Sequence, residues 1–217
     1  MGQPVIILFG PAGSGKGTQA SQLVVRFNFQ KITAGDLVRE EAVKDTERGR
    51  MVKEITEPGG LLPDDVITEL IVERMQSLDT SRGMVIDGYP RTEGQRVSLN
   101  AMLEKIGRLS DVVAIEISIS DDEAIRRITL RSQCSQCGTI FSDPALSVCP
   151  ECSGKVIARP DDASVESVKI RLALFHEKTE PAIQRYADEG KLITIRGEQS
   201  ADVVTSELMK KLEERLS

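Results

Sequence analysis

The chain reads Gly10-Pro-Ala-Gly-Ser-Gly-Lys-Gly-Thr18 directly after an apolar run, Val5-Ile-Ile-Leu-Phe9. The residues that follow carry apolar side chains at positions 20, 23, 24 and 27, which is helical spacing. Glycines let backbone N–H groups turn toward an anion, and the start of a helix adds a partial positive charge. Strand, glycine-rich loop and helix in this order predict a phosphate-binding loop, in which Lys16 reaches the outer phosphates of a nucleotide.

One position of this loop departs from the usual pattern. Gly17 follows Lys16, so the hydroxyl that ordinarily ligates Mg²⁺ comes one residue later, at Thr18. We therefore do not expect the loop to ligate the metal directly.

The composition is that of an ordinary globular protein, with 217 residues, 40% of them hydrophobic and 29% charged. The apolar runs are far shorter than the roughly 20 residues that cross a bilayer, and no basic and apolar leader opens the chain. The net charge of −6 and the absence of Trp disfavour a general nucleic-acid or anionic-membrane binder. We expect a cytoplasmic monomer without nucleic-acid or membrane partners.

Predicted strands and helices alternate along the chain, which favours an α/β fold with a doubly wound, five-stranded parallel sheet. The expected strands are Val5–Phe9, Phe29–Ile32, Gly83–Asp87, Val112–Ile119 and Leu192–Ile195. One helix is expected directly after the glycine-rich loop, and a second is expected to begin at Asp64. Two more are expected over Glu93–Ile106 and Asp121–Arg131, and a long one from Val165 to Ala187 with an interruption near Pro181. The last helix is expected from apolar residues four apart between Val204 and Leu216.

A charge-rich segment, residues 37–55, interrupts this alternation. It predicts a small helical insert with little core of its own, in which most charges lie on a solvated face. Pro58-Gly59-Gly60 closes it.

A second interruption carries all four cysteines as two C-x-x-C pairs with eleven residues between them. In a chain without a leader this spacing favours a metal over disulfides, and four thiolates select a structural Zn²⁺. Iron is the main alternative metal, and a redox dithiol is a weaker one. A nucleic-acid-binding zinc ribbon is disfavoured because Lys155 is the only basic residue between positions 132 and 158. The expected ligands are Cys134, Cys137, Cys149 and Cys152.

Four blocks of sequence resemble the nucleoside monophosphate kinases, and among them the adenylate kinases with a long, zinc-containing lid. They are Gly10–Thr18, Thr33-Ala-Gly-Asp-Leu-Val-Arg39, Asp87-Gly-Tyr-Pro-Arg-Thr92 with Gln95, and Arg159-Pro-Asp-Asp162. The resemblance implies a core of residues 1–32, 63–124 and 163–217, a monophosphate-binding insert at 33–62 and a lid at 125–162. It also implies Mg²⁺-dependent, reversible transfer of the terminal phosphoryl group of ATP to AMP.

The resemblance assigns roles to individual residues. ATP would be bound by Gly13, Ser14, Gly15, Lys16, Gly17, Thr18, Arg127 and Arg131. AMP would be bound by Ala34, Arg39, Leu62, Gly88, Arg91, Gln95, Arg159 and Arg171. Charge on the moving phosphoryl group would be stabilised by Lys16, Arg91, Arg131, Arg159 and Arg171. Asp87 would hold Mg²⁺ through its water shell.

Two positions leave the register of the lid open. Arg126 stands beside Arg127, so either could be the first lid arginine, and one extra residue separates Asp162 from Arg171 relative to the family spacing. No general base is evident. The single histidine, His176, is expected to be an ordinary surface residue.

The acceptor nucleotide is also left open. Adenylate kinases usually carry Thr where this chain has Ala34, whereas uridylate–cytidylate kinases usually carry Ala. Thr92 and Gln95 resemble the adenylate pattern, in which the glutamine amide contacts the edge of adenine. AMP is therefore favoured, with UMP or CMP as the alternative. A non-catalytic nucleotide-binding switch is disfavoured because Lys16 is retained together with the candidate arginines.

Overall fold

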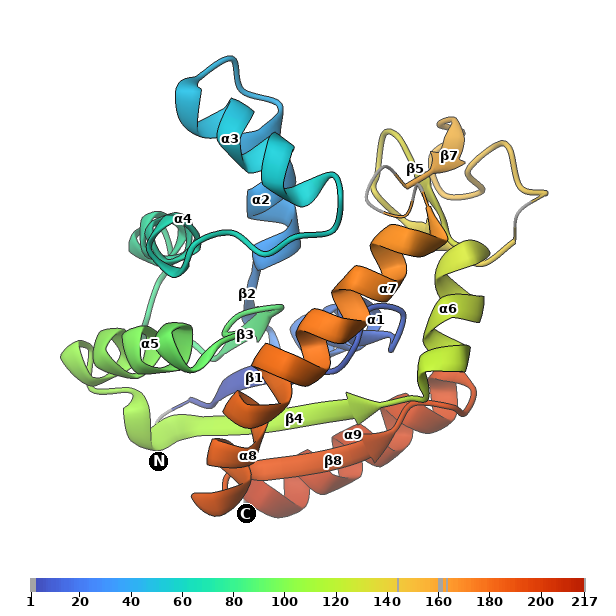
Figure 1. Ribbon diagram of the computed structural model, residues 1–217. Coiled ribbons are helices and arrows are strands. Elements are labelled where there is room, and N and C mark those ends of the chain that lie inside the picture. Colours follow the sequence, from blue (N-terminus) through green and yellow to red (C-terminus); the bar gives the residue numbers. More distant parts are fainter. Residues whose placement is uncertain (1–2, 144, 160–161, 163, 217) are drawn as a thin grey trace.

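The computed structural model describes residues 3–143, 145–159, 162 and 164–216. Its centre is a parallel sheet with the strand order β2-β3-β1-β4-β8 (Figure 1). The strands are β1 (Val5–Phe9), β2 (Gln30–Thr33), β3 (Met84–Asp87), β4 (Val112–Ser118) and β8 (Leu192–Arg196). The five strands expected from the sequence are present, and the predicted fold class is confirmed.

Helices cover both faces of this sheet, which explains its continuous apolar runs. On one face, Ile6 and Leu8 of β1 pack with α1 (Lys16–Phe27) and α9 (Ala201–Leu216). On the other face, Val5 and Ile7 pack with α4 (Asp64–Gln76), α5 (Glu93–Lys105) and α8 (Glu180–Asp188). A short 3₁₀ turn, η1 (Leu109–Asp111), precedes β4. Among the described residues, no helix combines the length and the apolar character that a membrane span requires.

The charge-rich insert folds as two helices, α2 (Ala34–Ala42) and α3 (Glu47–Thr56). Most of its charges are solvated as expected, but Glu41 is only 2% exposed. Arg48 Nε donates to Glu41 Oε1 at 2.8 Å, and Lys44 Nζ donates to Oε2 at 2.6 Å. Arg48 also donates to Glu73 of α4 at 3.1 Å, and this exposed contact connects the insert to α4.

The cysteine region forms a second, three-stranded antiparallel sheet that the sequence did not reveal. Its strands are β5 (Ser132–Cys134), β6 (Ile140–Phe141) and β7 (Val156–Ala158), in the order β6-β5-β7. Figure 1 shows this sheet apart from the central one, beyond the ends of α6 (Asp121–Thr129) and α7 (Val165–Leu174). These two helices pack together through Ala124 and Ile128 of α6 and Val168 and Leu172 of α7.

The expected interruption near Pro181 is a π-helical turn, η3 (Phe175–Thr179), directly before α8. Proline lacks an N–H group and its ring crowds the carbonyl four residues earlier, so the preceding turn widens. His176 lies in this turn and is 45% exposed, as expected of a surface residue. Its imidazole contacts Asp121 of α6 at 2.9 Å and Glu180 of α8 at 2.7 Å.

Replacing Arg48 by Met should destabilise the fold, because a buried carboxylate loses its main partner. We expect a loss of about 1–3 kcal/mol in the free energy of unfolding at pH 7. The matched control is Arg50→Met on the same helix, whose exposed pair with Asp45 should contribute less than about 1 kcal/mol. Urea denaturation measures both, and equal effects of the two changes would contradict the role of the buried pair.

The Arg48 contribution should also depend on pH. The hydrogen bonds from Arg48 and Lys44 lower the pKa of Glu41 from 4.5 to about 2 in the folded protein. Since the unfolded chain takes up this proton first, the stabilisation is complete above about pH 4.5 and is lost as the pH falls toward 2. The difference in stability between the parent and Arg48→Met should shrink over that interval.

Candidate functional site

A cavity of about 1100 Å³ lies at the carboxyl ends of β1 and β3 and the start of α1. In open parallel sheets this is where ligands bind. The cavity is strongly basic: among the described residues, nine basic side chains and two carboxylates, Asp36 and Asp87, line it. The basic residues are Lys16, Lys31, Arg39, Arg91, Arg126, Arg127, Arg131, Arg159 and Arg171.

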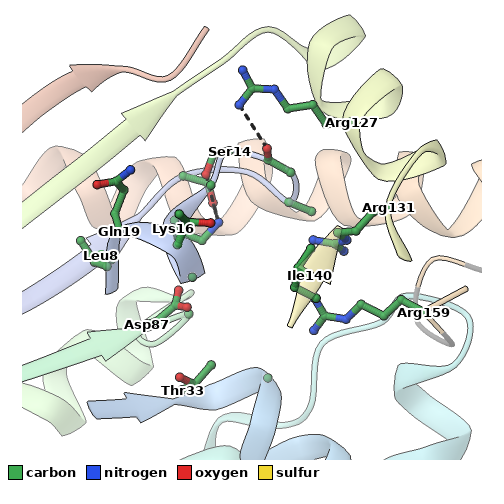
Figure 2. Close-up of a pocket in the computed structure, with 18 of the residues that line it drawn as sticks. Leu8, Ser14, Lys16, Gln19, Thr33, Asp87, Arg127, Arg131, Ile140 and Arg159 are labelled. Atoms are coloured by element: carbon green, nitrogen blue, oxygen red, sulfur yellow. Dashed lines mark hydrogen bonds between the residues drawn. The ribbon is translucent and has the colours of Figure 1, made fainter. Parts of the chain in front are cut away.

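The glycine-rich loop between β1 and α1 forms one wall of the cavity (Figure 2). Gly10 has a φ of 139°, and a Cβ there would clash with the carbonyl oxygen of Ile117, so only glycine fits the close approach. Lys16 Nζ donates to the carbonyl oxygens of Gly10 at 2.6 Å and Pro11 at 2.7 Å. It also donates to Ser14 Oγ at 3.3 Å. The lysine thus lies folded against the loop.

Burial lowers the pKa of Lys16 from 10.5 to about 7. The nearby Asp87 carboxylate opposes this shift, whereas three arginines of the cavity, Arg91, Arg131 and Arg171, add to it. The ammonium group is therefore poorly compensated without an anion, and a bound phosphate would favour its charged form.

On the lid side of the cavity, the buried carboxylate of Asp162 pairs with two arginines. Arg131 donates to both oxygens of Asp162, at 2.6 and 2.7 Å, and Arg171 donates to one of them at 2.9 Å. The side chain of Asp162 is only 3% exposed. The extra residue before Arg171 therefore does not prevent Arg171 from sharing the Asp162 carboxylate with Arg131. Arg159, which follows β7, lines the same cavity, and Figure 2 shows it near Arg131.

Arg127 is the arginine of α6 that contacts the glycine-rich loop. Its guanidinium donates to the carbonyl oxygens of Gly197 at 2.8 Å and Gly13 at 3.5 Å, while Glu123 accepts from its Nε at 2.6 Å. The neighbouring Arg126 is 61% exposed and pairs with Glu123. Both arginines line the cavity, and in this structure Arg127 is the one that contacts the glycine-rich loop.

The opposite side of the cavity carries Arg39 and Arg91. Arg39 of α2 pairs with Asp36, and Arg91 Nε donates to the carbonyl oxygen of Gly88 at 2.9 Å. Three expected residues do not line the cavity in this conformation: Ala34, Leu62 and Gln95 are buried, with exposures of 3%, 7% and 2%. The Gln95 amide instead accepts from the backbone N–H of Arg91 at 2.7 Å and donates to Asp64 at 2.9 Å.

Asp87 ends β3 inside the cavity and is 8% exposed. Burial raises the pKa of its carboxyl group, and the nearby Lys16 and Arg91 oppose that shift. Two other buried polar atoms on the cavity lining, Gln19 Oε1 and Thr33 Oγ1, have no hydrogen-bond partner among the described residues. Sequence reasoning missed Gln19 and Lys31, and no motif marks them as cavity residues.

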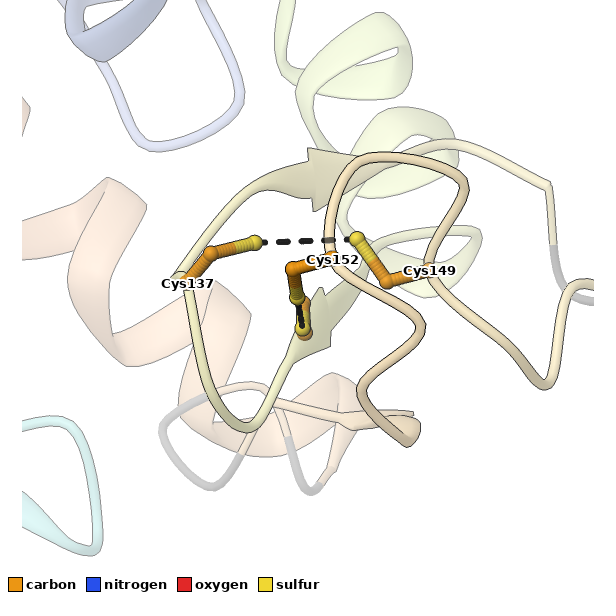
Figure 3. A group of neighbouring side chains, drawn as sticks. Cys137, Cys149 and Cys152 are labelled. Carbon is orange, nitrogen blue, oxygen red and sulfur yellow. Dashed lines mark hydrogen bonds between the residues drawn. The ribbon is translucent and has the colours of Figure 1, made fainter.

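The four cysteines converge on one point of the small sheet (Figure 3). Their Sγ atoms all lie within 4.8 Å of one another, with Cys134 to Cys152 at 3.4 Å and Cys137 to Cys149 at 3.6 Å. None forms a disulfide. Cys134 and Cys149 are buried, whereas the other two are exposed. This arrangement of soft ligands is suited to one tetrahedral metal ion.

Comparison with known proteins agrees with this geometry. The family model described as adenylate kinase matches residues 8–191. The chain belongs to the adenylate kinase family. Three relatives named adenylate kinase support this. The one from Kosmotoga olearia is 37% identical over 213 residues, which cover 96% of this chain and 98% of the relative. The one from Methanosarcina barkeri is 39% identical over 208 residues (94% and 95%), and that from Fervidobacterium nodosum is 37% identical over 204 (92% and 93%).

Within an adenylate kinase, the low pKa of Lys16 predicts a proton uptake that accompanies nucleotide binding. At pH 8 the free lysine is mostly neutral, and the phosphates of a non-hydrolysable ATP analogue should restore its charge. Calorimetric titration in two buffers of different ionisation enthalpy measures the protons taken up. Lys16→Arg is the control, because its guanidinium is always charged while the phosphates titrate as before. Equal proton uptake by both proteins would contradict the assignment.

Proposed function

We propose that this chain transfers the terminal phosphoryl group of ATP reversibly to AMP, giving two molecules of ADP. The observation that carries the proposal is one cavity in which a glycine-rich loop, its lysine and arginines from five separate segments converge. Family membership supports the same reaction and makes the chain a phosphotransferase. None of the relatives described above is named for UMP or CMP.

The cavity suits this chemistry because the protein forms no covalent bond to the phosphoryl group and acts by positioning and electrostatic stabilisation. The reaction requires two nucleotides in line, exclusion of water and positive charge around the moving group. In our proposal the loop residues 13–18 and Arg127 bind ATP, while Arg39 and Arg91 bind the phosphate of AMP. Arginine's planar fork suits this task, since it grips two phosphate oxygens at once.

Three further arginines, two of the lid and one of α7, would surround the transferred group. Arg131 and Arg171 are held by Asp162 in this conformation, so they would exchange a carboxylate for phosphate oxygens when substrates bind. Arg159 would join them. Residues 33–62 and 125–162 are proposed as the two inserts that close over the core, as lids do in such enzymes. We also propose that the protein acts as a cytoplasmic monomer.

Asp87 is our candidate for holding Mg²⁺ through water. The fit rests on a buried carboxylate beside Lys16 and on the two unpartnered polar atoms, Gln19 Oε1 and Thr33 Oγ1, in the same cavity. A hydrated cation carries water molecules that can satisfy such atoms. When bound, Mg²⁺ would neutralise charge on the phosphates of ATP.

AMP is the proposed acceptor on the strength of Gln95 and Thr92. Ala34 and Leu62 are proposed to pack near its base and sugar. Ala34 lies close to Gly88, because a Cβ built on Gly88 would lie 3.7 Å from the Cβ of Ala34. An alanine there leaves more space than the usual threonine, which would weaken discrimination against smaller bases.

Zn²⁺ is the metal that we propose for the four cysteines. Zinc–sulfur bonds of about 2.3 Å in a tetrahedron place sulfur atoms about 3.8 Å apart. Two observed separations, 3.4 and 3.6 Å, are close to this value, and all of the sulfur atoms lie within 4.8 Å of one another. The small sheet has few buried apolar side chains, so a metal would supply most of its stability.

We expect one Zn²⁺ per chain in carefully purified protein, measured by elemental analysis. Because the ligands belong to a local sheet, removing the metal or making Cys149→Ser should lower Tm while the far-ultraviolet circular dichroism of the central fold persists. Iron in place of zinc would contradict the choice of metal. A protein with neither ion would contradict the metal site itself.

Lys16→Met and Arg91→Ala should each lower kcat for ADP formation from ATP and AMP by about 10²-fold or more, since each removes a charge from the transition state. Arg50→Ala is the control, because that side chain is 67% exposed and does not line the cavity. Circular dichroism verifies that the variants fold. Turnover near that of the parent in either cavity variant would overturn the proposed mechanism.

A further inference from the structure

The carboxylate of Asp64 joins the starts of two helices. Asp64 is the first residue of α4, and its side chain reaches the first turn of α5. Oδ2 accepts from Thr92 Oγ1 at 2.7 Å, and Oδ1 accepts from Gln95 Nε2 at 2.9 Å. Thr92 Oγ1 in turn caps α5 by accepting from the backbone N–H of Gln95 at 3.1 Å.

The local sequence is compatible with this contact only because of Gly94. A Cβ at that position would clash with Asp64 Oδ2. The sequence Thr92-Glu-Gly-Gln95 therefore supplies a hydroxyl, an open space and an amide to one carboxylate.

The Gln95 amide is held from both of its ends. Its oxygen accepts from the backbone N–H of Arg91 at 2.7 Å, and its nitrogen donates to Asp64. Rotating the amide by 180° would set its NH₂ group against the N–H of Arg91 and its oxygen against the carboxylate. Both contacts would be repulsive in a residue that is 2% exposed, where unmade hydrogen bonds are costly.

We propose that Asp64 is a positioning residue that fixes the Gln95 amide in one orientation and so selects the acceptor base by its hydrogen-bonding pattern. This inference rests on the proposed function, in which Gln95 contacts the base. The fixed amide retains one N–H and one oxygen lone pair for a ligand. Their positions cannot be exchanged while Asp64 and the Arg91 N–H hold the group.

A fixed amide distinguishes bases of similar shape. Adenine and cytosine present an amino donor beside a ring-nitrogen acceptor, whereas hypoxanthine and uracil present a carbonyl acceptor beside a ring N–H donor. The amide can match only one of these patterns without rotating. With AMP as the proposed acceptor, the matching pattern is that of adenine, so the enzyme should prefer AMP to IMP, and any activity on pyrimidines should favour CMP over UMP.

Asp64→Asn tests this with almost no change in volume. An asparagine can turn its own amide to accept from Gln95 or to donate to it, so the orientation of Gln95 is no longer fixed at that end. We expect the AMP/IMP and CMP/UMP ratios of kcat/KM to fall by about tenfold, as when one charge-assisted hydrogen bond stops opposing the rotation. KM for ATP should stay unchanged.

Thr92→Val is the matched control, since it removes the α5 cap and one Asp64 contact but keeps the contact from Asp64 to Gln95. It should lower Tm and leave both ratios near those of the parent. In a Gln95→Ala background, Asp64→Asn should have no further effect on either ratio.

Each result decides the matter. Ratios that are unchanged in Asp64→Asn, or that fall equally in Thr92→Val, overturn the positioning role although AMP remains a substrate. A decrease that persists without Gln95 also overturns it. If the parent does not phosphorylate AMP at all, the proposed function fails instead.

Discussion

Repulsion between like charges is the constraint on which this structure depends. Nine basic side chains line one cavity of a chain whose net charge is −6. In a partly buried cavity such charges are poorly screened. Carboxylates behind the guanidinium groups offset the repulsion: Asp162 holds Arg131 and Arg171. Glu123 likewise holds Arg127. The positive charge that remains attracts anions such as polyphosphates, and, in addition to burial, it contributes to the lowered pKa of Lys16.

Carboxylates also connect neighbouring helices elsewhere in the fold. Glu41 receives Arg48 where the insert meets α4, and Asp64 receives Gln95 where α4 meets α5. His176 lies between carboxylates of α6 and α8, at the base of the lid. The first contact joins α2 to α3 within the insert, and the second joins α4 to α5.

The sequence predicted the central sheet because buried parallel strands are continuous apolar runs, which need no knowledge of the fold to be recognised. It predicted the cysteine cluster because the spacing of the ligands is itself the motif. It did not predict the strands β5 to β7, which are two or three residues long and have no periodicity of their own. It did not predict that Glu41 is buried, since that glutamate stands among exposed charges of the same kind.

Local spacing alone thus determined the fold class, the glycine-rich loop and the cysteine cluster, because the residues that form each of these features are near one another in the chain. Tertiary structure alone decided that Arg127 contacts the loop while Arg126 stays exposed. It likewise decided that Gln95 faces Asp64, 31 residues away. The physical reason is that a hydrogen bond or a buried charge is defined by its partner. Packing of distant segments, and not spacing, brings those partners together.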